Sequence, residues 1–170
     1  YTNAGKSTLL GCISGANPKV ASYPFTTLAP HLGLVERPGH ERFIVADIPG
    51  LIEGAHDGTG LGIRFLRHVE RTRLLVHLVD GSAEAELDPV EAYRTIRGEL
   101  EAYGQGLAER EEIVVLTKSD LTAKVVKPGP GIPEKEVHRI SAMTGEGVED
   151  LLAAVARRLE HPQCLAGAVG

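Results

Sequence analysis

The chain begins with Tyr1-Thr2-Asn3-Ala4-Gly5-Lys6-Ser7-Thr8, and this stretch decides how the rest is interpreted. Its second half matches the end of a G-x-x-x-x-G-K-[ST] loop, whose first Gly would lie one residue before Tyr1. In such a loop, backbone N–H groups and a helix N-terminus hold phosphates. The Lys reaches the outer phosphates and the Ser hydroxyl binds Mg²⁺. Residues 3–8 are therefore candidate phosphate-binding residues, and Ser7 is a candidate metal ligand.

Composition predicts one globular domain. The 170 residues contain 42% hydrophobic and 24% charged residues, as in ordinary soluble domains. No apolar run approaches the ~20 residues of a membrane helix, so we expect no membrane partner. The net charge of −5 argues against a general nucleic-acid-binding surface. The two cysteines, Cys12 and Cys164, lack metal-site spacing, which favours a reducing, cytoplasmic compartment.

Hydrophobic patterns predict alternating strands and helices. Nearly continuous apolar runs indicate strands that are covered on both faces, and apolar residues at helical spacing indicate helices. Segment 17–31 is too rich in proline for an interior strand. We therefore expect a three-layer α/β/α fold with a mostly parallel sheet and one antiparallel hairpin. The expected strands cover 32–36, 42–47, 74–80, 112–117 and 137–140, with a hairpin turn at 38–40, and the expected helices cover 6–14, 63–73, 89–103 and 148–159.

Two further segments fit the phosphate end of a nucleotide. Asp47-Ile48-Pro49-Gly50 places a carboxylate at a strand end, where it suits the oxygen-rich shell of Mg²⁺, and its Gly N–H can face a γ-phosphate. Phe25-Thr26-Thr27 lies in the proline-rich segment, and a Thr hydroxyl there could complete the metal shell only when a γ-phosphate is present. Each segment has a plain structural alternative, since Asp caps turns and Thr pairs form them.

Two other segments fit a guanine base. In Thr117-Lys118-Ser119-Asp120, the last carboxylate can accept hydrogen bonds from the N1–H and exocyclic amine of guanine, which adenine cannot donate. The Lys stem can lie along the base plane. Ser141-Ala142-Met143 can offer a backbone N–H to the guanine O6. Strand ends at Asp47, Asp80, Thr117 and Ser141 put these segments at one edge of the sheet, where ligands bind in such folds.

In this order, the motifs resemble those of translation-factor-type P-loop GTPases, and more closely those of the Obg family. The resemblance rests on Tyr1–Ser7, Tyr23–Leu28, Asp47–Ala55 and Gly60–Arg73. It implies a P-loop NTPase G domain over residues 1–160, followed by a tail at 161–170. It further implies a slow, monomeric and cytoplasmic GTPase that binds GTP and GDP. This protein would act with the rRNA and proteins of the large ribosomal subunit, in assembly of that subunit and in growth or stress control.

Residue roles follow from the same resemblance. Ser7 and Thr27 would bind Mg²⁺, Lys6 the phosphates, and Thr117, Lys118 and Asp120 the base. The family more often has Asn where Thr117 stands, which puts the tethering of the base loop in question. In the resembled fold, a central strand leads into the phosphate loop, and this sequence does not contain it. The strands that end at Asp47 and Asp80 are therefore expected to have unpaired edges.

In many GTPases a Gln shortly after the glycine of the Asp47–Gly50 motif orients the attacking water. This chain needs another group for hydrolysis. Leu51 and Ile52 come after Gly50, and neither can orient water. GTPases that resemble this one use an Asn at the position of Asn3 with a bound K⁺ in place of an arginine finger, so K⁺-stimulated turnover is our hypothesis. The candidate catalytic residues are Asn3, Lys6, Thr27 and Gly50. Glu53 is a weaker candidate for positioning water and is better interpreted as a surface acid.

Two other functions remain open. One is a non-catalytic guanine-nucleotide sensor or ribosome-docking module, which the absence of the Gln partly favours. The other is an ATP-using P-loop enzyme, which Asp120 disfavours.

Overall fold

The computed structural model describes residues 5–14, 19–20, 31–37, 42–47, 72–104, 106–121, 132 and 137–160. In the second half of the chain, the observed bounds differ from the predicted ones by at most one residue. In chain order, the elements are α1 (Lys6–Ile13), β1 (Lys19–Val20), β2 (His31–Glu36), β3 (Arg42–Ala46), β4 (Leu75–Asp80), α3 (Pro89–Tyr103), β5 (Glu112–Thr117), the 3-10 helix η1 (Ser119–Leu121), β6 (Val137–Arg139) and α4 (Val148–Glu160).

The strands form two three-stranded sheets. In the antiparallel sheet, β2 pairs with both β1 and β3, and in the parallel sheet β5 lies between β4 and β6. The parallel sheet and the antiparallel hairpin are thus both present. The two sheets are separate: among the described strands, none lies between β3 and β4 to join them, and β3 and β4 do not pair with each other. These are the two strands for which unpaired edges are expected.

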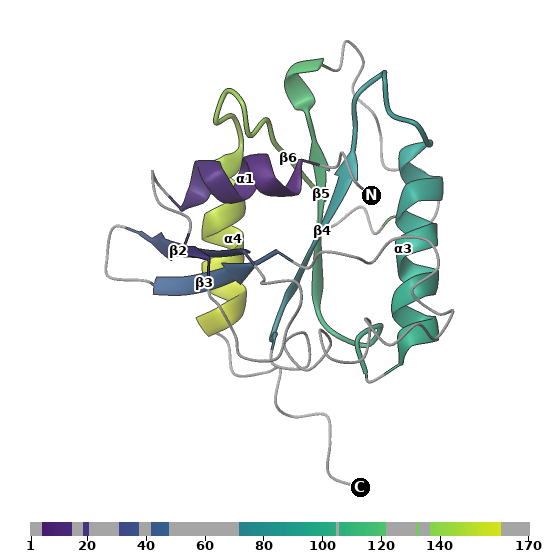
Figure 1. Ribbon diagram of the computed structural model, residues 1–170, viewed down its shortest axis with the longest axis horizontal. Helices are drawn as coiled ribbons and strands as arrows, with labels where there is room; N and C mark the ends of the chain where they lie inside the picture. The colour runs from purple at the N-terminus through teal and green to yellow at the C-terminus, as the bar shows by residue number, and fades with distance from the viewer. Residues whose placement is uncertain are drawn as a thin grey trace, which may run out of the picture.

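The parallel sheet is covered on both faces. Figure 1 shows α3 on one side of β4 and β5, and α1 and α4 on the other. Side chains of β5 alternate between the two layers: Ile113 and Val115 belong to the core on the α4 side, while Val114 and Leu116 belong to the core on the α3 side. All four are 3% exposed or less. This double burial explains why the strand is apolar throughout.

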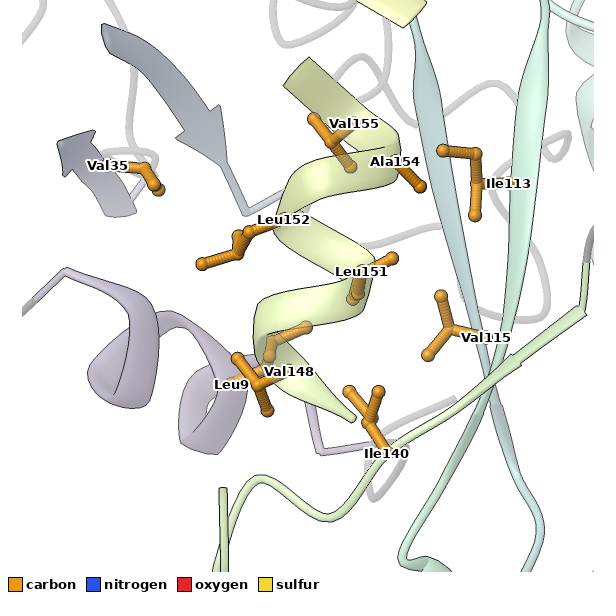
Figure 2. Close-up of a cluster of buried hydrophobic side chains, with 10 residues drawn as sticks. All are labelled: Leu9, Val35, Ile113, Val115, Ile140, Val148, Leu151, Leu152, Ala154 and Val155. Atoms are coloured by element: carbon orange, nitrogen blue, oxygen red, sulfur yellow. The ribbon is translucent and has the colours of Figure 1, made fainter. Parts of the chain in front are cut away.

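The core on the α4 side joins elements from both sheets. Figure 2 shows side chains of α4 pointing toward β5 on one flank and toward α1 and β2 on the other. Since β2 belongs to the antiparallel sheet, α4 packs against both sheets and holds them in one domain. The ten buried residues of this core are Leu9, Val35, Ile113, Val115, Ile140, Val148, Leu151, Leu152, Ala154 and Val155.

Helix α1 lies directly on β2 because residue 33 has no side chain. A Cβ on Gly33 would lie 2.8 Å from Cδ1 of Leu10, the end of a flexible side chain, and 3.1 Å from Cβ of Ser14, so a side chain here would crowd the contact between α1 and β2. This close approach sets the position of α1. It therefore also helps to place Gly5 and the first turn of α1.

The structure differs from the predicted elements at residues 19–20, 72–73 and 119–121, the last of which form the unpredicted 3-10 helix η1. Residues 19–20 of the predicted loop form the short strand β1, which pairs with β2 at the edge of the sheet. A strand at an edge tolerates nearby prolines because its outer side needs no partner. Thr72 and Arg73, the end of the predicted helix 63–73, are not helical. The rest of that helix, the turn at 38–40 and the tail at 161–170 lie outside the described residues.

Among the helices that the structure describes, none combines the length and apolar character that crossing a bilayer requires.

Candidate functional site

The start of α1 has the features of an anion site. Gly5 precedes the helix with φ of 82°, a left-handed conformation that suits glycine, and its carbonyl accepts a hydrogen bond from the N–H of Leu9 at 2.9 Å. No side chain in the described ranges caps this N-terminus. The N–H groups at the start of a helix have no partner within the helix, so an anion can satisfy them. Together with the half-buried Lys6 and the exposed Ser7, they favour a bound phosphate.

The start of α1 lies beside the end of β5. A Cβ built on Gly5 would be 3.9 Å from both Cβ and Oγ1 of Thr117. Figure 1 shows the same arrangement, with α1 beginning next to the ends of the parallel strands. The structure thus brings together the phosphate-binding and base-binding motifs, which are far apart in the sequence.

Thr117 ties the base loop to β4. Its side chain is buried, and its hydroxyl donates to the carbonyl of Val79 at 3.3 Å. Its own carbonyl accepts a hydrogen bond from the N–H of Gly81 at 3.1 Å. A Thr at this position therefore does tether the loop, through its hydroxyl and without the amide that Asn would supply.

Lys118 is held by the carboxylate of Asp80, for which the sequence pattern predicts only a position at a strand end. Its backbone has φ of 58°, a left-handed conformation that costs a non-glycine residue about 1 kcal/mol. Its Nζ lies 2.5 Å from Oδ2 of Asp80, and Oδ1 of Asp80 accepts from the N–H of Ser82 at 2.9 Å. Burial raises the pKa of Asp80, but the hydrogen bonds from Lys118 and Ser82 and the charge of Lys118 outweigh it and lower the pKa below its ordinary value.

Asp120 is presented to solvent on η1. Its side chain is exposed, and among the residues that the structure describes it has no hydrogen-bond or ion-pair partner. The η1 turn itself is fixed, because the N–H of Ser119 donates to the carbonyl of Ile140 at 3.1 Å. A carboxylate held on a fixed turn, with no partner in the described part of the chain, suits a ligand with two neighbouring N–H donors.

The second base-binding segment is a tight turn built on a buried serine. Ser141 is 0% exposed; its N–H donates to the carbonyl of Glu146 at 3.0 Å, and its Oγ accepts from the N–H of Thr144 at 3.1 Å. The N–H of Ser141 is thus used within the turn. A backbone donor for the guanine O6 must come from Ala142 or Met143, and the latter side chain is 78% exposed.

Asp47 meets the requirement for a metal-shell carboxylate. It directly follows β3, and its Oδ1 is buried without a hydrogen-bond partner in the described part of the chain. A buried carboxylate oxygen without a partner is costly unless an ion or water satisfies it. Mg²⁺ is commonly held by one or two protein oxygens, water and substrate phosphates, so Asp47 and the exposed hydroxyl of Ser7 fit such a site.

Comparison with known proteins identifies the family. Residues 1–118 match a protein family described as 50S ribosome-binding GTPase. The chain is 57% identical to GTPase Obg of Desulfosudis oleivorans over 154 residues, which are 88% of the chain and 46% of that protein. It is 52% identical to GTPase Obg of Roseiflexus castenholzii over 166 residues, 95% of the chain and 38% of that protein. The chain belongs to the Obg family of GTPases.

The chain spans about half or less of the length of these Obg relatives. Solved structures agree on the fold. The G domain of the Thermotoga maritima FeoB iron transporter superposes with a TM-score of 0.66 at 21% identity, covering 93% of each chain. A putative nucleolar GTP-binding protein 1 from Plasmodium falciparum gives 0.66 at 17% identity, covering 95% of this chain and 83% of that one.

In this Obg-family chain, the structure therefore brings the described site residues of the α1 start, the base loop and the Ser141 turn to one end of the parallel sheet. The other predicted site residues lie outside the described residues and keep the status of predictions. These are Asn3, Ala4, Phe25, Thr26, Thr27, Pro49 and Gly50.

Proposed function

We propose that this chain is the nucleotide-binding domain of a GTP-hydrolysing switch protein. The observation that carries the proposal is the position of Asp120. It is exposed, has no partner among the described residues, and stands on a turn fixed next to the loop that meets Gly5. In this arrangement a base held at Asp120 and phosphates held at the start of α1 belong to one ligand. A carboxylate that accepts from two N–H groups favours guanine over adenine.

In this proposal, each residue contacts the part of the nucleotide or metal that its position allows. Backbone N–H groups of the first turn of α1 and the ammonium of Lys6 hold the phosphates. Asp120 accepts from the base, the stem of Lys118 lies along its plane, and the N–H of Ala142 or Met143 donates to O6. Mg²⁺, when bound, neutralises charge on the outer phosphates. Ser7 and Asp47 would hold it, and Thr27 would join only while a γ-phosphate is present, so that hydrolysis releases the loop.

The partner we propose is the large ribosomal subunit, in its assembly and in growth or stress control. Support comes from the family description, which names binding to the 50S ribosome. A cytoplasmic, monomeric protein fits this role.

Two measurements test the proposed function. In the full-length protein, GDP should displace a labelled guanine nucleotide at concentrations at which ADP does not. Single-turnover hydrolysis of GTP should be slow alone and faster with large ribosomal subunits. Competition by ADP equal to that by GDP would contradict the guanine assignment. Tight GTP binding without hydrolysis, with or without subunits, would favour a non-catalytic sensor, which the Leu51 after Gly50 also suits.

Potassium provides a separate test of how hydrolysis works without a Gln. If Asn3 positions a K⁺ that takes the place of an arginine finger, GTP hydrolysis by the full-length protein should be faster in KCl than in NaCl by about tenfold or more. An Asn3→Ala variant should lose this difference. Equal rates in the two salts, or K⁺ stimulation that persists in Asn3→Ala, would contradict the hypothesis.

A further inference from the structure

The ammonium of Lys118 forms an ion pair at the end of β4. Its Nζ lies 2.5 Å from Oδ2 of Asp80, and the two side chains are 32% and 19% exposed. Asp80 is itself held, because its Oδ1 accepts from the N–H of Ser82 at 2.9 Å. The charged end of the Lys118 side chain therefore has a defined position without any ligand.

The backbone end of Lys118 is fixed as well. On one side, the carbonyl of Thr117 accepts from the N–H of Gly81 at 3.1 Å, and on the other, the N–H of Ser119 donates to Ile140 at 3.1 Å. These contacts hold the left-handed backbone of Lys118 between β4 and β6. With both ends fixed, the four-carbon stem spans a set path at the sheet edge, beside the turn that carries Asp120.

We propose that Asp80 is a positioning residue for nucleotide binding, which acts by holding the stem of Lys118 along the path where a guanine plane would rest. The inference rests on the proposed function, in which Lys118 and Asp120 receive the base. A lysine side chain is flexible, and ordering it only when the ligand arrives weakens binding. Ordering it beforehand removes this cost, which is how preorganised sites gain affinity.

The test is a double-mutant cycle read through the dissociation rate of a fluorescent GDP analogue from the full-length protein. Asp80→Asn keeps the shape and an acceptor for Ser82 but removes the charge that holds Lys118. We expect it to speed GDP release by about tenfold, the size typical of a lost charge-assisted hydrogen bond. In a Lys118→Met background, the same change should alter the rate by less than about twofold, because the residue through which it acts is gone.

Glu111→Gln is the matched control. It is the same carboxylate-to-amide exchange in another ion pair, with Arg158, just before the start of β5 and thus at the opposite end of the strand. It should leave GDP release at the wild-type rate.

Several results would overturn the inference. They are a wild-type release rate in Asp80→Asn, an equal effect of Asp80→Asn in the Lys118→Met background, or an equal effect of Glu111→Gln. Failure of Asp80→Asn to fold would also overturn it, since Asp80 would then serve the fold itself. Wild-type protein that binds no GDP would instead refute the proposed function, and the inference with it.

Discussion

Alanine in place of Asp120 is expected to weaken GDP binding by about 100- to 1000-fold. The variant removes the acceptor of two hydrogen bonds to the base, and a hydrogen bond to a charged group is worth about 1.5–3 kcal/mol. Two such bonds sum to about 3–6 kcal/mol, and because every 1.4 kcal/mol is tenfold in affinity, the lower part of that sum, roughly 3–4 kcal/mol, gives this range. The fold should be little affected, since the side chain is exposed and has no partner among the described residues. Isothermal titration of the full-length protein with GDP measures the loss.

Inosine diphosphate makes this prediction specific to the base. Its hypoxanthine retains the N1–H of guanine and lacks the exocyclic amine, so wild-type protein should bind it about tenfold more weakly than GDP. Asp120→Ala should bind the two nucleotides equally. A variant that still prefers GDP would show that another group recognises the amine.

A stability control accompanies this experiment. Asp88 caps α3, where its Oδ1 accepts from the N–H of Val90 at 2.9 Å. Asp88→Ala should lower the free energy of unfolding by about 1 kcal/mol without changing GDP affinity. If it weakens GDP binding as Asp120→Ala does, loss of stability rather than loss of a base contact would explain both.

Secondary structure in the second half of the chain could be predicted because local patterns and tertiary demands agree there. Helix α3 starts at a proline that follows a capping Asp and ends before Gly104, which has φ of 73°. Strand β5 is apolar on both faces and is buried on both. By contrast, β1 has two residues and exists only through pairing with β2, which no local pattern reveals.

The site could be predicted as motifs but not as contacts. Asp80 closes a strand in the sequence pattern, yet its role depends on the parallel register that sets it beside Thr117, and on the left-handed backbone of the next residue, Lys118. The spacing of residues in the sequence reveals neither the strand register nor this backbone conformation. The same holds for the hydroxyl of Thr117, whose bond to Val79 needs the neighbouring strand in place.

Gly147 joins the Ser141 turn to α4, and its lack of a side chain is a geometric requirement. A Cβ there would lie 2.1 Å from the carbonyl oxygen of Arg139, a backbone atom of β6 that cannot move without disturbing the sheet. The residue also has φ of 70°, and its carbonyl accepts from the N–H of Leu151 in the first turn of α4. The turn, β6 and α4 therefore meet at this residue.

Gly147→Ala is expected to lower the free energy of unfolding by about 3 kcal/mol or more, through backbone strain and the forced separation of the turn from β6. Gly145→Ala is the matched control: its φ of 83° is equally left-handed, but a Cβ there would have no atom within 4 Å. It should lose only about 1 kcal/mol. Urea unfolding of both variants measures the difference. Equal losses would mean that backbone conformation alone is responsible, and that β6 does not constrain the turn. A larger loss in Gly147→Ala, with GDP affinity reduced only in that variant, would show that the base-binding turn depends on its contact with β6.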